Sequence, residues 1–161
     1  MAQSVPDFTA LLQTLVGHGV DFIVVGGVAA VLHGAPVTTL DLDLVHSRSP
    51  DNLTRLVSAL EDLGAYYRGH RKLRPTAEHL ASSEHRLLMT RYGPLDILGA
   101  IGRDHGFDAL SPHTSELIVG EMRLRVLGLE KLIAVKEEVG HEKDMMVLPT
   151  LRRTLEERSK K

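Results

Sequence analysis

Residues 22–45, FIVVGGVAAVLHGAPVTTLDLDLV, constrain the fold most, because they carry three elements in one almost uninterrupted apolar stretch. The run 22–25 predicts a buried strand, and the glycine pair after it predicts a turn. The Ala-rich segment that follows predicts a brief helix ending at Gly34. Alternating leucines then predict a second strand over 40–45.

Two aspartates, Asp41 and Asp43, lie on this second predicted strand. Side chains alternate across a strand, so both project from one face, roughly 6–7 Å apart. Asp is among the residues that strands tolerate least, and a third acid, Asp96, interrupts the apolar stretch PLDIL. If the strands are neighbours, the three carboxylates form the oxygen-ligand set that magnesium prefers. The alternative is that all three are solvated acids at strand edges and ends.

Gly26 and Gly27 occupy the turn between the first strand and the short helix. Without Cβ atoms, the backbone at this turn can approach a ligand closely and offer its amides to an anion such as phosphate. The alternative is a tight turn with no ligand, because neither a G-x-G-x-x-G motif nor a GK[ST] loop is present. The combination of this turn with the nearby Asp pair favours a phosphate site.

The rest of the chain predicts a single α+β domain, 1–161, with a mixed sheet. A long loop is expected over 68–83, and the last residues, about 154–161, are predicted to form a solvated tail. Other expected elements are helices at 8–16 and 50–63, two strands within 85–98, a hairpin within 116–128 and helices over the C-terminal third.

Lys136 lies on the apolar stripe of the predicted helix 129–140, after Leu132 and Ile133. A lysine on the inward face of a helix needs an anion. The alternative is that its stem packs while its ammonium group reaches water. Lys143, near the start of the next helix, is a weaker candidate of the same kind.

Composition excludes several classes of protein. The formal net charge of −2 indicates no global basic field for nucleic acid. The absence of cysteine removes disulfides, thiolate metal sites and cysteine nucleophiles, and is compatible with a reducing cytosol. We found no export signal and no run of about 20 apolar residues, so a cytoplasmic protein without a membrane partner is expected.

The glycine turn, the Asp41-Leu42-Asp43 triplet and Asp96 together resemble the motif of the nucleotidyltransferase fold shared with DNA polymerase beta. Three stretches, HGVDFIVVGGVAAVLHG, TTLDLDLV and LEKLIAVKEEVGHEKD, are similar to minimal bacterial nucleotidyltransferases related to the toxins of abortive-infection toxin–antitoxin systems. The resemblance covers most of residues 7–150. It implies a mixed sheet flanked by helices, with further helices at the C-terminus, and transfer of a nucleoside monophosphate from an NTP such as ATP to a hydroxyl, releasing pyrophosphate.

The resemblance also implies roles for individual residues. Two Mg²⁺ ions, or Mn²⁺ in their place, would be held by the catalytic carboxylates Asp41, Asp43 and Asp96. The nucleotide would be contacted by Gly26, Gly27, Thr39, Lys136 and Lys143. The chain departs from the pattern at Val37, where relatives often carry a basic residue, and at Gly27, where better-known members have Ser.

The acceptor implied by the resemblance is a tRNA end, a protein hydroxyl or an antibiotic, and an antitoxin partner is expected if the chain is a toxin component. Two other readings stay open. One is an inactive nucleotide-binding module of the same fold. The other is a nucleic-acid-binding module that uses the basic loop 68–74, which contains Arg68, Arg71, Lys72 and Arg74.

Overall fold

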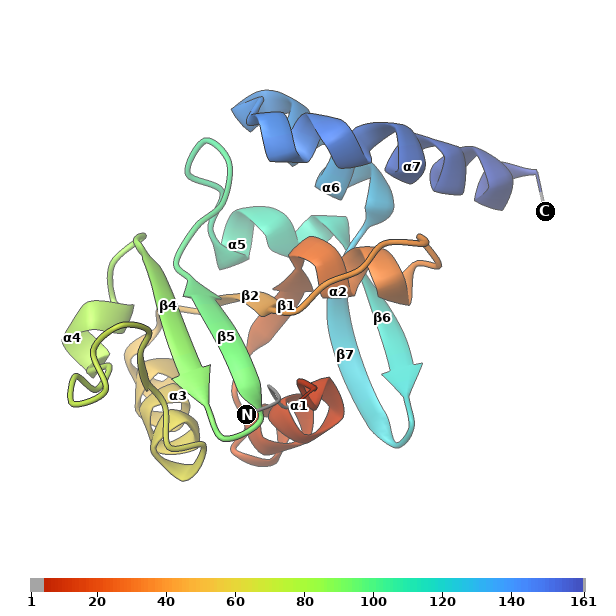
Figure 1. Ribbon diagram of the computed structural model, residues 1–161. Coiled ribbons are helices and arrows are strands. Elements are labelled where there is room, and N and C mark those ends of the chain that lie inside the picture. The colour runs from red at the N-terminus through yellow and green to blue at the C-terminus, as the bar shows by residue number, and fades with distance from the viewer. Residues whose placement is uncertain (1–4, 161) are drawn as a thin grey trace.

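A seven-stranded mixed sheet forms the centre of the protein, as seen in a computed structural model that describes residues 5–160 (Figure 1). Its strand order is β3-β4-β5-β2-β1-β7-β6. The strands are β1 (Phe22–Val25), β2 (Leu42–His46), β3 (Tyr66–Tyr67), β4 (His85–Thr90), β5 (Gly93–Leu98), β6 (Thr114–Val119) and β7 (Met122–Leu127). This α+β architecture confirms the predicted fold class.

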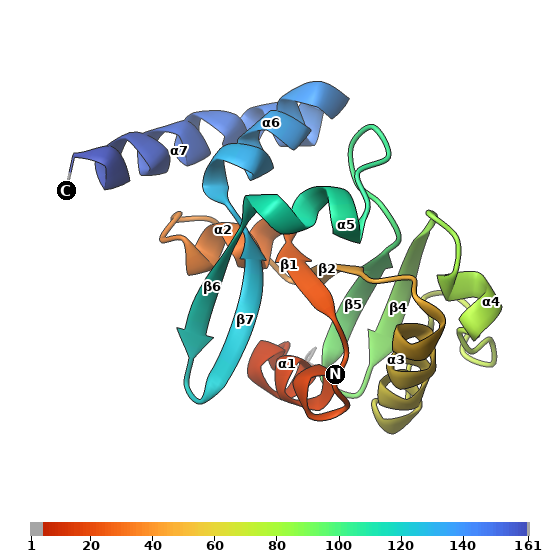
Figure 2. The same ribbon diagram turned by 180° about the vertical axis from the view of Figure 1, so that it is seen from behind.

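Helices flank the sheet on both sides. They are α1 (Phe8–Gly17), α2 (Gly26–Leu32), α3 (Pro50–Asp62), α4 (Ala77–Leu80), α5 (Phe107–Leu110), α6 (Leu129–Val139) and α7 (Glu142–Ser159). Figures 1 and 2 show α6 and α7 lying together on the side of the molecule opposite α1 and α3. None of the helices in the described part of the chain is both long enough and apolar enough to cross a bilayer.

The two central strands that carry acids also supply the core, because their side chains alternate between two faces. The residues next to the aspartates in sequence, Leu42, Leu44, Leu95 and Ile97, are fully buried. They belong to the same core as Leu11 and Leu15 of α1 and Leu56 and Leu60 of α3. One face of the sheet is therefore packed, and the carboxylates lie on the other face.

Most predicted elements are confirmed, while two boundaries need correction and three short helices were not predicted. Strand β2 begins only at Leu42, because the chain bends at Asp41 and leaves Leu40 65% exposed. The predicted loop 68–83 contains α4, which the Thr76 side chain caps. The short α5 and a 3₁₀ helix (Ser111–His113) were not predicted. The predicted tail continues α7 as far as Ser159, and Thr154 within it is buried.

Candidate active site

Asp43 and Asp96 are neighbours in the sheet. Strands β2 and β5 are parallel, and their register pairs Asp43 directly with Asp96. On its other side, β2 is antiparallel to β1, and Asp43 pairs with Val25, the residue before the glycine turn. The fold therefore brings together two acids that are far apart in the sequence and places Asp43 beside Gly26.

Gly26 approaches Asp43 so closely that no side chain would fit between them. A Cβ atom added at Gly26 would overlap Oδ2 of Asp43, and the φ angle of Gly26 is +66°. Gly27 is equally crowded, because a Cβ there would lie 2.7 Å from Oγ1 of Thr39. The glycine pair is thus required for the turn to lie against the carboxylate, which is a stronger reason than the tight turn considered from the sequence.

Asp41 lies two residues before Asp43, on the bend that leads into β2. The hydroxyl of Thr39 donates to the backbone carbonyl of Asp41 at 3.0 Å, which fixes this bend. Thr39 therefore acts on the backbone that positions Asp41 and, through its contact with Gly27, on the glycine turn.

Arg68, which follows β3, is a site residue that the sequence did not single out individually. Its Nη2 donates to Oδ1 of Asp96 at 2.5 Å, and its Nη1 lies 3.7 Å from Oδ1 of Asp41. The sequence offered only a basic loop as a signal. The guanidinium instead balances part of the negative charge of the carboxylates.

Burial and mutual repulsion shift the titration of the two paired acids. Burial, together with the neighbouring Asp96 and Asp41 carboxyls, raises the pKa of Asp43 to about 8. Burial also raises the pKa of Asp96, against the opposing effect of Arg68. In addition, Oδ1 of Asp43 is buried and has no hydrogen-bond partner within residues 5–160. Burying an unpaired carboxylate oxygen lowers the stability of the fold unless a proton or a cation binds to it.

Lys136 lies on the buried side of α6, as predicted, with its side chain 21% exposed. Its ammonium group donates to Oδ1 of Asp144 at 2.9 Å, so its anion in this structure is a neighbouring acid on α7. Both residues line a cavity of about 320 Å³ together with Gly26 and Asp43. Lys143 is exposed and does not line this cavity, so the structure does not bring it to the other candidates.

The donor set suits a hard divalent cation. Three carboxylates lie on one face and the buried Oδ1 of Asp43 lacks a partner, which is the chemistry Mg²⁺ requires. However, no group of three or more His, Cys, Asp or Glu side chains within residues 5–160 has the geometry of a formed metal centre. Arg68 is paired with two of the three acids, so its guanidinium supplies positive charge beside them in this arrangement.

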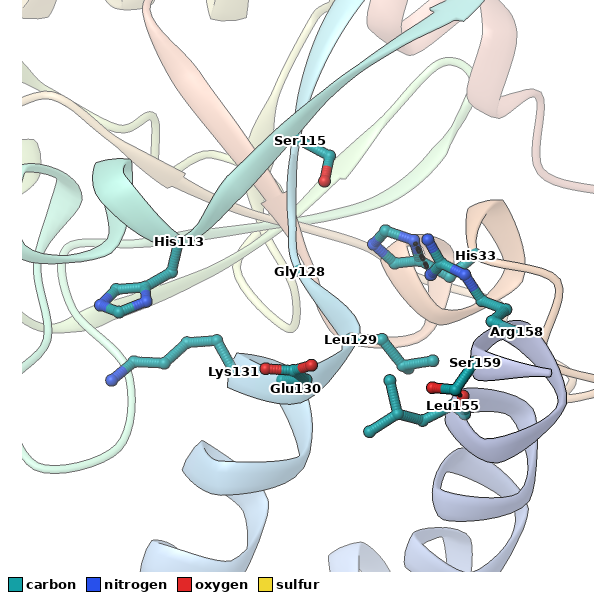
Figure 3. Close-up of a pocket in the computed structure, with 10 residues that line it drawn as sticks. All are labelled: His33, His113, Ser115, Gly128, Leu129, Glu130, Lys131, Leu155, Arg158 and Ser159. Carbon is teal, nitrogen blue, oxygen red and sulfur yellow. Dashed lines mark hydrogen bonds between the residues drawn. The ribbon is translucent and has the colours of Figure 1, made fainter. Parts of the chain in front are cut away.

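A separate cavity of about 390 Å³ lies at the opposite ends of α2, α6 and α7 (Figure 3). There the His33 ring faces the Arg158 guanidinium, which donates to Nδ1 of His33 at 2.9 Å. The other ring nitrogen, Nε2, bonds the carbonyl of Leu127, and burial lowers the pKa of His33. All polar atoms of this histidine are satisfied internally, and none of the predicted site residues lines this cavity.

No protein-family model matches the chain, and no curated protein matches it. Several solved structures are similar to it, among them two with a TM-score of 0.59. One is TM1012 of Thermotoga maritima, assigned as a nucleotidyltransferase, at 17% identity and covering 93% of each chain. The other is the lincosamide antibiotic adenylyltransferase LnuA with lincomycin bound, at 15% identity and covering 90% of this chain and 94% of that one. At these identities the likeness establishes the fold.

Proposed function

We propose that this chain, which has the nucleotidyltransferase fold, transfers a nucleoside monophosphate from an NTP to a hydroxyl group and releases pyrophosphate. One observation carries the proposal most directly. The glycine turn lies against Asp43, and Asp43 lies beside Asp96. An anion-binding backbone next to paired carboxylates is the arrangement that metal-assisted phosphoryl chemistry needs.

In this proposal, Asp41, Asp43 and Asp96 would hold Mg²⁺, or Mn²⁺ in its place. Two such ions, when bound, would neutralise the triphosphate and lower the pKa of the acceptor hydroxyl. The backbone amides of Gly26 and Gly27 would bind phosphate oxygens, since a turn without Cβ atoms can approach a ligand closely. Thr39 would keep this turn and the bend at Asp41 in place.

Lys136 would neutralise the charge of the leaving group, and Asp96 would accept the proton of the acceptor. The ammonium group of Lys136 would neutralise the pyrophosphate as it leaves, after exchanging its contact with Asp144 for one with a phosphate. Asp96 would take the proton of the acceptor hydroxyl, because it lies beside Asp43 among the carboxylates of the site. Arg68 would have to leave Asp96 when the cation binds.

The alternative of an independent nucleic-acid-binding loop is weakened by two of its four basic residues. Arg68 is paired with the carboxylates, and Arg74 donates to the backbone carbonyls of Gly64 and Ala65. Only Arg71 and Lys72 of this group remain exposed without such contacts among the described residues. A toxin role, an antitoxin partner and an inactive module stay predictions from the sequence.

Thermal unfolding with Mg²⁺ and each NTP tests the proposal without knowledge of the acceptor. A ligand at a hundredfold excess over its Kd stabilises the folded state by about 2.7 kcal/mol. For a chain of this length, that raises the melting temperature by roughly 5–10 °C. We expect this shift with Mg²⁺ and NTP together, and a much smaller one with either alone.

The joint shift should vanish in the double variant Asp41→Ala/Asp43→Ala. The double variant Glu156→Ala/Glu157→Ala is the matched control, because it removes two exposed acids on α7. If no NTP shifts the melting temperature, or if the carboxylate variant shifts as the control does, the nucleotide site proposed here is wrong.

A further inference from the structure

One loop forms part of the wall of the cavity of about 320 Å³ that contains Gly26 and Asp43. It joins β5 to α5, and its residues 101–105 fold into a narrow turn that extends toward the paired helices α6 and α7 (Figures 1 and 2). Ile101 and His105 close this turn, because each donates its backbone amide to the carbonyl of the other, at 2.9 and 2.8 Å. We call residues 101–105 the cavity loop, and the cavity, after its proposed ligand, the nucleotide cavity.

A single side chain of α6 holds the cavity loop. Oε2 of Glu138 accepts a hydrogen bond from the backbone amide of Arg103 at 2.9 Å. The same carboxylate contacts Nε2 of His105, at 3.1 Å from Oε1 and 3.0 Å from Oε2. One carboxylate therefore fixes both the tip of the loop and the residue that closes it.

The backbone of the cavity loop has an uncommon conformation. The φ angle is +58° at Gly102 and +65° at Asp104. L-residues rarely adopt such values, and Asp104 is the one residue other than glycine that does so within residues 5–160. A Cβ atom at Gly102 would lie 2.5 Å from Oε2 of Glu138, so the glycine allows the backbone to approach the carboxylate. A loop of this shape depends on contacts outside itself, and Glu138 supplies such contacts.

The cavity loop and α6 form adjoining walls of the nucleotide cavity. Ile101 and Gly102 line the cavity from the loop, and Val135 and Val139 line it from α6. Glu138 lies between these two valines in the sequence but is not one of the residues that line the cavity. Its carboxylate therefore acts from outside the cavity, by determining how the loop lies against α6.

The nucleotide cavity has a charged lining and an aliphatic lining. The charged groups are those of Asp43, Lys136 and Asp144, which suit a metal ion and phosphates. The aliphatic side chains are those of Leu98, Ile101, Leu132, Val135 and Val139. Phosphate groups avoid aliphatic walls, so the side of the cavity formed by the loop suits the nucleoside part of an NTP.

We propose that Glu138 is a positioning residue for NTP binding, which holds the cavity loop so that the loop covers the nucleoside; this inference rests on the proposed function. When the carboxylate releases the loop, the cavity opens on that side and NTP enters or leaves. When the contacts form again, Ile101 covers the nucleoside and excludes water from it. Glu138 itself touches neither the phosphates nor the reacting atoms.

Limited proteolysis measures the attachment of the loop without any substrate. Trypsin cleaves after Arg103, at the exposed tip of the loop, and mass spectrometry compares that cut with the cut after Arg71, which is exposed in the basic loop. Cleavage of a locally opened segment follows the population of its open form. We expect Glu138→Ala to raise the rate of the Arg103 cut about tenfold, because the loop loses its hydrogen bonds to α6, with the Arg71 cut unchanged.

Two variants separate the hydrogen bonds of Glu138 from its charge. Glu138→Gln loses the charge but keeps an oxygen that accepts from the Arg103 amide, so the cleavage rate should stay within about threefold of the wild type. Glu137→Ala removes the adjacent acid of α6, which pairs with Arg152, and should leave the rate unchanged. Equal rates in Glu138→Ala and the wild type, or an equal rise of the Arg71 cut, would overturn the inference.

Melting-temperature titrations in Mg²⁺ connect the loop to the nucleotide. The apparent Kd for NTP, obtained from the rise of melting temperature with NTP concentration, should increase about tenfold in Glu138→Ala and return close to the wild-type value in Glu138→Gln. Inorganic tripolyphosphate lacks the nucleoside, so Glu138→Ala and the wild type should bind it equally. In the wild type, NTP with Mg²⁺ should slow the cut after Arg103, and tripolyphosphate should not.

The outcomes distinguish this inference from the proposed function. If NTP stabilises the wild type but Glu138→Ala binds NTP as tightly, or loses affinity for tripolyphosphate to the same degree, this inference is wrong and the proposed function stands. If no NTP stabilises the wild type, the proposed function fails and this inference fails with it. If Glu138→Ala does not fold, the wild type decides, because an Arg103 cut that NTP does not slow overturns the inference.

Discussion

Asp43 of β2 and Asp96 of β5 pair directly in the register of two parallel strands. Neither acid has a packing reason to be there, and their proximity raises the cost of ionising both. The pKa of Asp43, raised to about 8 mainly by burial, expresses that cost. Four predictions follow from the groups arranged around this pair.

The first concerns pH. Because the folded chain keeps a proton on Asp43 that the unfolded chain releases near pH 3.8, the contribution of Asp43 to the free energy of unfolding in metal-free buffer is fully present below that pH and is lost as pH rises toward about 8. Asp43→Asn cannot ionise, so at about pH 9 it should be more stable than the wild type by about 1–3 kcal/mol. It should also lack nucleotidyl transfer.

Thermal unfolding between about pH 5 and pH 9 measures this difference. Asp108→Asn, which removes an exposed acid of α5, should follow the wild-type pH profile. If the pH profiles of thermal unfolding were parallel for the wild type and Asp43→Asn, the pKa of Asp43 would not be raised in the folded chain.

The second concerns the glycine turn. Gly26→Ala should lower the free energy of unfolding by about 2 kcal/mol or more, because a positive φ costs an L-residue about 1–2 kcal/mol and the new Cβ displaces Asp43. Transfer should fall about a hundredfold, since the carboxylate is misplaced. Gly34→Ala is the control, because its φ is +92° but nothing lies within 4 Å of its Cβ position. It should lose stability and keep activity, and equal losses of activity would contradict the close-approach argument.

The third concerns Arg68 as the internal counter-ion of Asp96. Arg68→Gln should lower the Mn²⁺ concentration for half-maximal thermal stabilisation about three- to tenfold, because the metal no longer competes with the guanidinium. Arg71→Gln removes the same charge from the same loop without a contact to the acids, and should change metal affinity less. Similar affinities in the two variants would mean that Arg68 exerts only a general electrostatic effect.

The fourth concerns Lys136 and its partner. Lys136→Met keeps the packing of the stem but removes the charge, so the KM for NTP should rise or turnover should fall, by about tenfold, with the fold intact. Asp144→Asn should act in the opposite direction and lower this KM, because it frees the ammonium group and removes a negative charge from the cavity. Steady-state kinetics with varied NTP measures both. If both variants changed the KM for NTP in the same direction, the contact between Lys136 and Asp144 would have only a structural role.

The sequence alone determined the local pattern of the site. Alternation in residues 40–45 and in PLDIL fixed which side chains share a face, and the missing Cβ atoms at positions 26 and 27 marked the turn. These features are periodic or depend on single residue types, so they can be recognised without the fold. The expected helices and hairpins were found for the same reason.

Only the tertiary structure decided which groups meet. Arg68 reaches Asp96 across 28 residues of chain, from a loop without periodicity. The turn between α6 and α7 decides that Asp144 faces Lys136 while Lys143 faces solvent. Such contacts follow from strand order and from the way helices pack, which local sequence does not encode, and here they separate residues that merely carry charge from residues that form the site.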